Sequence, residues 1–91
     1  MINSEVQRFR LYVIGDNPAS RRAKFNFEKI TRDLFNNQAV LEVIDIKQNP
    51  NMAEDNHIVA VPTLVRLSPH PCVKIIGDLT DIPTLRAFFG V

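Results

Sequence analysis

The sequence predicts an α/β domain with the element order β-α-β-α-β-β-α. In the first half, short runs rich in β-branched residues flank a long helical segment, which is the usual crossover between parallel strands. In the second half, two more short runs are joined by a proline-containing turn and followed by a final helical segment, as in a hairpin and a helix. The 91 residues suit a single domain, residues 1–91.

The first strand is expected in RFRLYVIG, residues 8–15, where charged and apolar residues alternate before an apolar run. A helix is predicted over residues 18–35. Asp16 or Asn17 can cap it, and Pro18 suits its first position because a proline has no N–H that would need a partner there. Apolar residues at steps of four, four, three and four form one stripe along the helix: Ala19, Ala23, Phe27, Ile30 and Leu34.

The next segment predicts a second strand and a marginal helix. VLEVIDI, residues 40–46, is rich in β-branched residues and is expected to pair in parallel with the first strand. Residues 47–58 contain turn residues and then a weak helical pattern that Asn49 or Asn51 could cap. Because the apolar content of this segment is low, we expect its helix to be only marginally stable.

The last third of the chain predicts a hairpin and a helix. The hairpin strands are VPTLVRL, residues 61–67, and CVKIIG, residues 72–77, with SPHP as the turn. The final helix, in DIPTLRAFFG at residues 81–90, can be capped by Thr80 or Asp81. Its inner face is expected to consist of Ile82, Leu85 and Phe89.

This order of elements resembles a minimal thioredoxin-like domain, a fold that places a cis-proline where Pro62 stands. A redox member needs two thiols at the start of the first helix, where the helix dipole lowers the pKa of the attacking cysteine. The matching segment DNPAS, residues 16–20, has no sulfur, and the single cysteine, Cys72, lies across a proline-rich turn. Ser20 has no histidine nearby in sequence, so a polar residue of the first helical turn is a simpler interpretation than a nucleophile. We therefore expect a protein that is not an enzyme.

Composition and charge exclude several classes of protein. The net charge of +1 gives no reason to expect a nucleic-acid partner, and no apolar run reaches membrane-spanning length. One cysteine without a signal peptide fits a reducing cytoplasm. His57 and His70 with that cysteine make a poor metal site, and GDNPAS lacks the phosphate-loop signature. We expect no metal and no cofactor.

The predicted first helix has a basic outer surface, whereas the part of the chain after it is acidic. The basic residues are Arg21, Arg22, Lys24, Lys29 and Arg32, and the acidic ones are Asp33, Glu42, Asp45, Glu54 and Asp55. This asymmetry indicates oriented docking to a charged partner. Phe25, which lies off the apolar stripe, is either a partner contact or a second core contact. Arg66 and Lys74 could be cross-strand neighbours on an exposed face of the hairpin.

Three segments together resemble the KaiB family of bacterial clock proteins: LYVIGDNPAS, VIDIKQNPNMAEDNHIVAVPTL and IIGDLTD. The resemblance extends from about Phe9 to Asp81. It implies a non-enzymatic protein that binds the hexameric ATPase KaiC, with KaiA and a SasA-type kinase as further partners. It also implies self-association, as a dimer or tetramer, in the ground state. The alternative is a thioredoxin-like sensory domain of a SasA-type histidine kinase, which also binds KaiC.

The resemblance further implies which residues contact the partner. The basic partner-binding positions of the family match Arg22 on the first helix and Lys74 on the hairpin, and Arg66 matches a third basic position. His57 stands where a lysine is common in the family, which makes that contact pH-sensitive or weaker.

Finally, the resemblance implies a second fold, in which roughly residues 49–91 form β-α-α-β and the whole chain β-α-β-β-α-α-β. Gly77 and Asp78 match a glycine–aspartate pair that helps to set the balance between the two folds. The residues themselves offer a physical basis for two folds. The segment NMAEDNHIVA has only a weak preference for any secondary structure. Three prolines can also each have a preferred peptide-bond isomer: Pro62, Pro69 and Pro71. Fold switching requires two packings separated by only a few kcal/mol.

Overall fold

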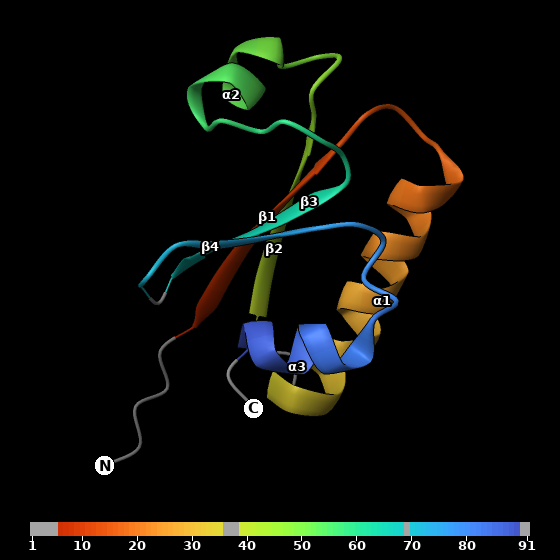
Figure 1. Ribbon diagram of the computed structural model, residues 1–91, viewed down its shortest axis with the longest axis vertical. Coiled ribbons are helices and arrows are strands. Elements are labelled where there is room, and N and C mark those ends of the chain that lie inside the picture. The colour runs from red at the N-terminus through yellow and green to blue at the C-terminus, as the bar shows by residue number, and fades with distance from the viewer. Residues whose placement is uncertain (1–5, 36–38, 69, 90–91) are drawn as a thin grey trace.

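The computed structural model describes residues 6–35, 39–68 and 70–89 (Figure 1). The elements are β1 (Gln7–Val13), α1 (Pro18–Phe35), β2 (Ala39–Asp45), α2 (Pro50–Asp55), β3 (Thr63–Ser68), β4 (Val73–Ile76) and α3 (Ile82–Phe89). The predicted order β-α-β-α-β-β-α is therefore confirmed. Among the described residues, no helix combines the length and the apolar character that crossing a membrane requires.

The four strands form one sheet in the order β2-β1-β3-β4. β1 pairs in parallel with β2, as expected, and β3 runs antiparallel to both β1 and β4. Successive side chains of a strand point to opposite faces of a sheet. Leu11 accordingly belongs to a cluster with Phe27 of α1 and Leu85 of α3. Tyr12 belongs to a second cluster with Val65, against which the half-buried Met52 of α2 packs. The sheet thus has α1 and α3 on one face and α2 on the other.

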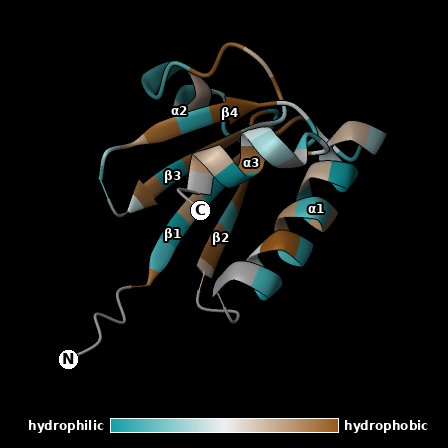
Figure 2. Ribbon diagram, turned by 60° about the horizontal axis from the view of Figure 1, so that its bottom comes forward, coloured by the Kyte–Doolittle hydropathy of each residue, from teal (hydrophilic) through white to brown (hydrophobic). Residues whose placement is uncertain are grey.

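Helix α1 begins as the sequence predicts. Asn17, rather than Asp16, caps it, since its Oδ1 accepts a hydrogen bond of 2.8 Å from the Ser20 N–H. Along the helix, Ala23 and Phe27 are buried, and the Phe27 ring meets Phe9 edge-on with the ring centroids 5.1 Å apart. Hydrophilic residues recur along the rest of α1 in Figure 2. The apolar stripe therefore anchors α1 and leaves its basic residues facing outward.

Helix α2 is short, and none of its residues is buried. Asn49 occupies its N-cap position but makes no capping bond with its side chain, which donates instead to the Asp45 main-chain oxygen at 3.2 Å. A helix is therefore present where the sequence predicts one, whereas its marginal stability stays a prediction. At α3 the capping residue is Asp81, not Thr80, because Asp81 Oδ1 accepts a bond of 3.3 Å from the Thr84 N–H.

The turn residues also have defined conformations. The Val61–Pro62 and His70–Pro71 peptide bonds are cis, and Pro69 lies outside the described residues. Gly77 ends β4 with φ +123° and donates its N–H to the Pro62 main-chain oxygen at 2.9 Å. The second arrangement of residues 49–91 stays a prediction, since the structure holds the thioredoxin-like one.

Candidate functional site

The junction between β1 and α1 is a turn closed by hydrogen bonds. Gly15 adopts φ +58° and donates its N–H to Asp45 Oδ1 at 3.1 Å, and Asn17 Nδ2 donates to the Ile14 main-chain oxygen at 2.9 Å. Ser20 is buried, and its hydroxyl has no hydrogen-bond partner among the described residues. Cys72 is exposed between β3 and β4. The junction thus keeps the strand, turn and helix of a thiol site but holds neither a thiol nor a serine with a base beside it.

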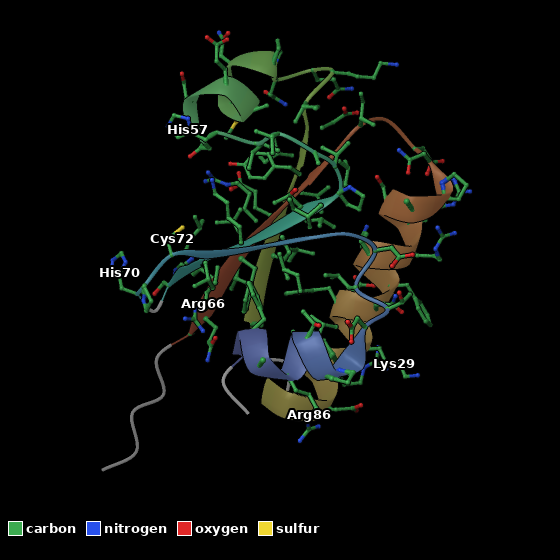
Figure 3. All side chains as sticks on the ribbon, viewed as in Figure 1. Lys29, His57, Arg66, His70, Cys72 and Arg86 are labelled. Carbon is green, nitrogen blue, oxygen red and sulfur yellow. The ribbon has the colours of Figure 1, made fainter. Side chains whose placement is uncertain are left out.

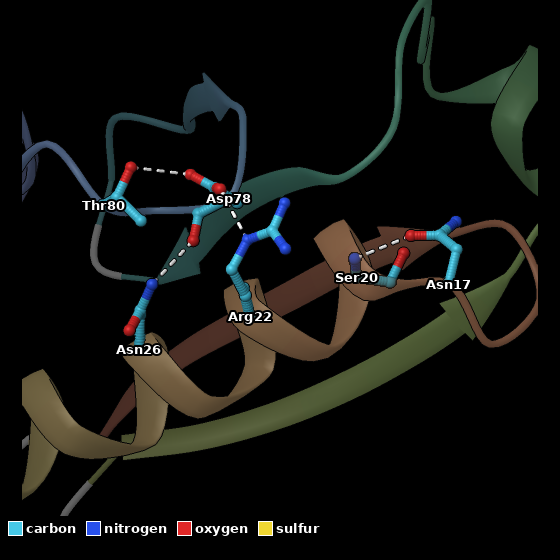
Figure 4. A network of polar contacts seen from close by, with 6 residues as sticks. All are labelled: Asn17, Ser20, Arg22, Asn26, Asp78 and Thr80. Atoms are coloured by element: carbon cyan, nitrogen blue, oxygen red, sulfur yellow. Dashed lines mark hydrogen bonds and ion pairs between the residues drawn. The ribbon is translucent and has the colours of Figure 1, made fainter.

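One turn further along α1, Arg22 joins the helix to the loop after β4 (Figure 4). Its Nε donates to Asp78 Oδ2 at 2.9 Å. Asp78 Oδ1 accepts from the Thr80 hydroxyl at 2.8 Å, and the Asp78 main-chain oxygen accepts from Asn26 Nδ2 at 2.9 Å. The Thr80 hydroxyl and, after it, the Arg22 guanidinium hold the pKa of Asp78 below its ordinary value.

Lys74 and His57 come together at the end of α2. Lys74 Nζ donates to the Asn56 main-chain oxygen at 2.8 Å, and Asn56 directly precedes His57. His57 is exposed beside α2 with φ 57°, a backbone conformation that histidine adopts more readily than most residues (Figure 3). The structure therefore brings two of the predicted partner-binding positions to one place.

Arg66 does not belong to that place. In the β3–β4 hairpin, Arg66 pairs with Val73 and Lys74 pairs with Val65, so the side chains of Arg66 and Lys74 point to opposite faces of the sheet. The expectation that they could be cross-strand neighbours on one face was wrong, because it depends on a register that the sequence does not show. Arg66 instead directs Nη1 to the Phe88 main-chain oxygen and Nη2 to that of Pro71, each at 3.4 Å.

Phe25 is 66% exposed, so the alternative of a second core contact does not hold. Its side chain lines a surface groove of about 500 Å³ between α1 and the edge strand β2. The groove has apolar walls that include Leu11, Val13 and Val43, and charged residues such as Lys24 and Glu28 also line it.

The basic surface of α1 is partly neutralised within the chain. Arg21 Nη1 pairs with Asp16 at 2.8 Å, and Arg22 pairs with Asp78. Lys24, Lys29 and Arg32 are exposed and form no ion pair with the described residues.

Two acidic residues likewise form hydrogen bonds or ion pairs within the chain. Asp45 Oδ1 accepts bonds from the Gly15 and Lys47 N–H groups, and Glu42 pairs with Arg10 Nε at 3.0 Å. The Tyr12 hydroxyl, which accepts from Arg10 Nη1, is the main cause of a raised pKa at Arg10.

The residues from 10 to 89 match a family model described as the KaiB domain. The chain is also 46% identical over 72 residues to the circadian clock oscillator protein KaiB of Rippkaea orientalis, a match that covers 79% of this chain and 69% of that protein. The chain belongs to the KaiB family. The circadian clock oscillator protein KaiB1 of Synechocystis is 44% identical over the same shares of the two chains. These relatives support a clock-related role.

Solved structures give the same fold. The N-terminal domain of SasA from Synechococcus elongatus has a TM-score of 0.79 at 22% identity, covering 98% of this chain and 88% of that one. Mitochondrial thioredoxin 3 from Saccharomyces cerevisiae has a TM-score of 0.69 at 17% identity, covering 91% and 74%. At these identities the likeness concerns the fold alone, and it confirms the thioredoxin-like arrangement of this KaiB-family chain.

Sequence reasoning missed two contributors to the site. Asn26 lies one helical turn after Arg22 on α1, and both side chains reach Asp78. The sequence indicates Thr80 only as a possible cap of the last helix, yet its hydroxyl donates a hydrogen bond to the Asp78 carboxylate. The spacing of Arg22 and Asn26 was readable in the sequence, but the partner that they share was not.

Proposed function

We propose that this chain is a non-enzymatic regulator that docks on a KaiC-type hexameric ATPase and changes the phosphorylation or output state of that ATPase. The observation that carries the proposal is the β1–α1 junction. It keeps the architecture of a thioredoxin active site without the thiols, and exposed cationic side chains follow it directly on α1. Such a junction suits recognition rather than group transfer.

The family resemblance implies that several basic residues of this chain contact the partner, and the structure does not suit all of them equally to that contact. Arg22 and Lys74 hold exposed cationic groups in defined positions, and His57 lies next to the Lys74 contact. Arg66 is half-buried and directs two nitrogens at main-chain oxygens, so it suits a structural role better. The proposed partner contacts are therefore Arg22 and the exposed Phe25 on α1, together with Lys74 and His57 beside α2. Their cationic groups favour an acidic surface on the ATPase.

The experiment is a titration of the ATPase hexamer with the wild-type chain and with the double variant Arg22→Glu/Lys74→Glu. Charge reversal at two contacts should weaken binding by at least about 100-fold. The matched control is Lys29→Glu/Arg86→Glu, which changes the net charge equally at exposed residues of α1 and α3 that form no ion pair with the described residues (Figure 3). Equal affinity of the wild-type chain and the Arg22/Lys74 variant would contradict the proposal.

A second candidate function is the sensory domain of a SasA-type histidine kinase, which the likeness to the SasA N-terminal domain favours. Light scattering of the free protein separates the two. A dimer or tetramer supports the KaiB-like regulator with a self-associated ground state, and KaiA and a SasA-type kinase are then further partners to test. A stable monomer, together with a kinase encoded downstream in the same reading frame, supports the sensory domain. We place either protein in the cytoplasm.

A further inference from the structure

Asp78 accepts three hydrogen bonds, two with its carboxylate and one with its main-chain oxygen. Its Oδ2 accepts from Arg22 Nε, its Oδ1 accepts from the Thr80 hydroxyl, and its main-chain oxygen accepts from Asn26 Nδ2, at 2.9, 2.8 and 2.9 Å (Figure 4). The Asp78 side chain is 27% exposed, whereas that of Arg22 is 55% exposed. Both carboxylate oxygens of Asp78 accept a hydrogen bond, and Asn26 holds its main chain. Asp78 can therefore hold the longer and more exposed Arg22 side chain in one orientation.

Among the described residues, Arg22 is bound through its Nε alone. Only its Nε contacts Asp78, and neither Nη1 nor Nη2 bonds to a described residue. In Figure 4 the two Nη atoms point away from the Asp78 carboxylate. A guanidinium can bind a carboxylate through two parallel N–H bonds, and the free Nη pair of Arg22 remains available for such a contact.

Other arginines with contacts in the described residues differ in this respect. Arg21 pairs with Asp16 through Nη1, and Arg10 uses both Nε and Nη1. Arg66 uses both terminal nitrogens. Among these side chains, Arg22 alone is fixed through Nε with both terminal nitrogens unengaged.

We propose that Asp78 is a positioning residue for partner binding, which orients Arg22 so that its Nη pair meets a carboxylate on an acidic partner. The inference rests on the proposed function, in which Arg22 contacts the ATPase. A side chain held in its binding geometry loses less conformational entropy when the complex forms. Positioning of one arginine should tighten the complex by about three- to tenfold.

The test titrates the ATPase hexamer with the Asp78→Asn variant. Removal of a negative charge should by itself strengthen binding to an acidic partner. Positioning predicts the opposite sign, a three- to tenfold weaker complex, because Arg22 is no longer held by a carboxylate. Asp16→Asn is the matched control, since it removes the same charge from the 2.8 Å Arg21–Asp16 pair, and it should leave binding unchanged or slightly tighter. Binding by Asp78→Asn that is unchanged or tighter than wild type overturns the proposal.

A double-mutant cycle then isolates the route through Arg22. Arg22→Ala should weaken the complex, and adding Asp78→Asn to Arg22→Ala should cause no further loss. A loss of the same size in both backgrounds shows that Asp78 acts by another route and overturns the proposal.

Thr80→Val, which keeps the charge but removes the hydroxyl bound to Asp78 Oδ1, covers the case in which Asp78→Asn disturbs the fold. It should weaken binding about twofold, and unchanged binding by a folded Thr80→Val counts against positioning.

A measurement on the free protein separates this inference from the proposed function. The Arg22 Nε–Hε resonance in ¹⁵N NMR should show the order of a fixed group in the wild type and should lose it in Asp78→Asn. A freely reorienting Arg22 Nε–Hε in the wild type overturns the positioning, whatever the ATPase does. An ordered Arg22 in a chain that does not bind the ATPase instead overturns the proposed function.

Discussion

Lys74 Nζ donates a hydrogen bond to the main-chain oxygen of Asn56 at 2.8 Å, which ties the edge strand β4 to the end of α2. None of the α2 residues is fully buried, so this bond adds to the packing of the half-buried Met52 in holding the helix in place. The exposed ammonium can keep this bond and still face a partner with its other two N–H groups.

Loss of that bond should loosen α2 more than it destabilises the domain. We expect Lys74→Met, which keeps the length of the side chain but removes the donor, to raise amide hydrogen exchange across residues 50–58. The free energy of unfolding should fall by only about 0.5–1 kcal/mol, because the bond is exposed. Lys29→Met is the control, an exposed lysine on α1 without an ion pair among the described residues. Unchanged exchange in Lys74→Met would show that α2 is held by other contacts.

The sequence predicted the features that depend on neighbouring residues. The capping residues before Pro18 predicted where α1 begins, and the helical spacing of its apolar residues predicted which of them are buried. The helix does begin at Pro18, and Ala23 and Phe27 are buried. A helix also forms within residues 47–58, where a weak helical pattern predicted one. Local patterns of this kind hold because the tertiary structure agrees with them.

The features that the sequence did not predict depend on register and on distant contacts. Whether Arg66 and Lys74 share a face is decided by how the hairpin strands pair, and a shift of one residue in the pairing moves a side chain to the other face. The Arg22–Asp78 pair joins residues 56 positions apart, and no local pattern indicates it. The family resemblance named both residues, but for different reasons and not as partners.

The lowered pKa of Asp78 predicts a specific acid dependence of stability. Because the folded state binds this proton less readily than the unfolded chain, the ionised carboxylate stabilises the fold above the ordinary aspartate pKa of about 3.8. That contribution should disappear as the pH falls through 3.8 and then through the lower pKa of the folded state. Urea unfolding of wild type and Asp78→Asn between pH 2.5 and about 6 checks this. The two stabilities should converge toward acid, and a constant difference over the range would contradict the assignment.

Two phenylalanines on α1 should respond differently to truncation. Phe27 is 2% exposed and packs against Phe9, so Phe27→Ala should lower the free energy of unfolding by about 3–5 kcal/mol. Phe25 is 66% exposed, so Phe25→Ala should change it by no more than about 0.5 kcal/mol. Urea denaturation of the two variants, which differ by two positions on the same helix, measures the contrast. A large loss in Phe25→Ala would show that this ring has a packing partner in solution.

Two glycines with positive φ should differ in which replacement they tolerate. Gly15 at φ +58° is in the left-handed helical region that asparagine also adopts, so Gly15→Asn should cost less stability than Gly15→Ala. Gly77 at φ +123° lies outside that region, so asparagine should offer no relief there. A Cβ at Gly77 would meet no atom within 4 Å, which makes the backbone conformation, rather than a clash, the source of the cost.

Thermal and urea unfolding of the four variants, Gly15→Ala, Gly15→Asn, Gly77→Ala and Gly77→Asn, tests this difference. Each unfavourable replacement should cost roughly 1–3 kcal/mol. At residue 15 the asparagine variant should recover a measurable part of the loss, whereas at residue 77 the two variants should be equally destabilised. If asparagine recovered as much stability at residue 77 as at residue 15, the backbone conformation assigned to Gly77 would be contradicted. Of the two glycines, only Gly77 has a φ that asparagine does not readily adopt.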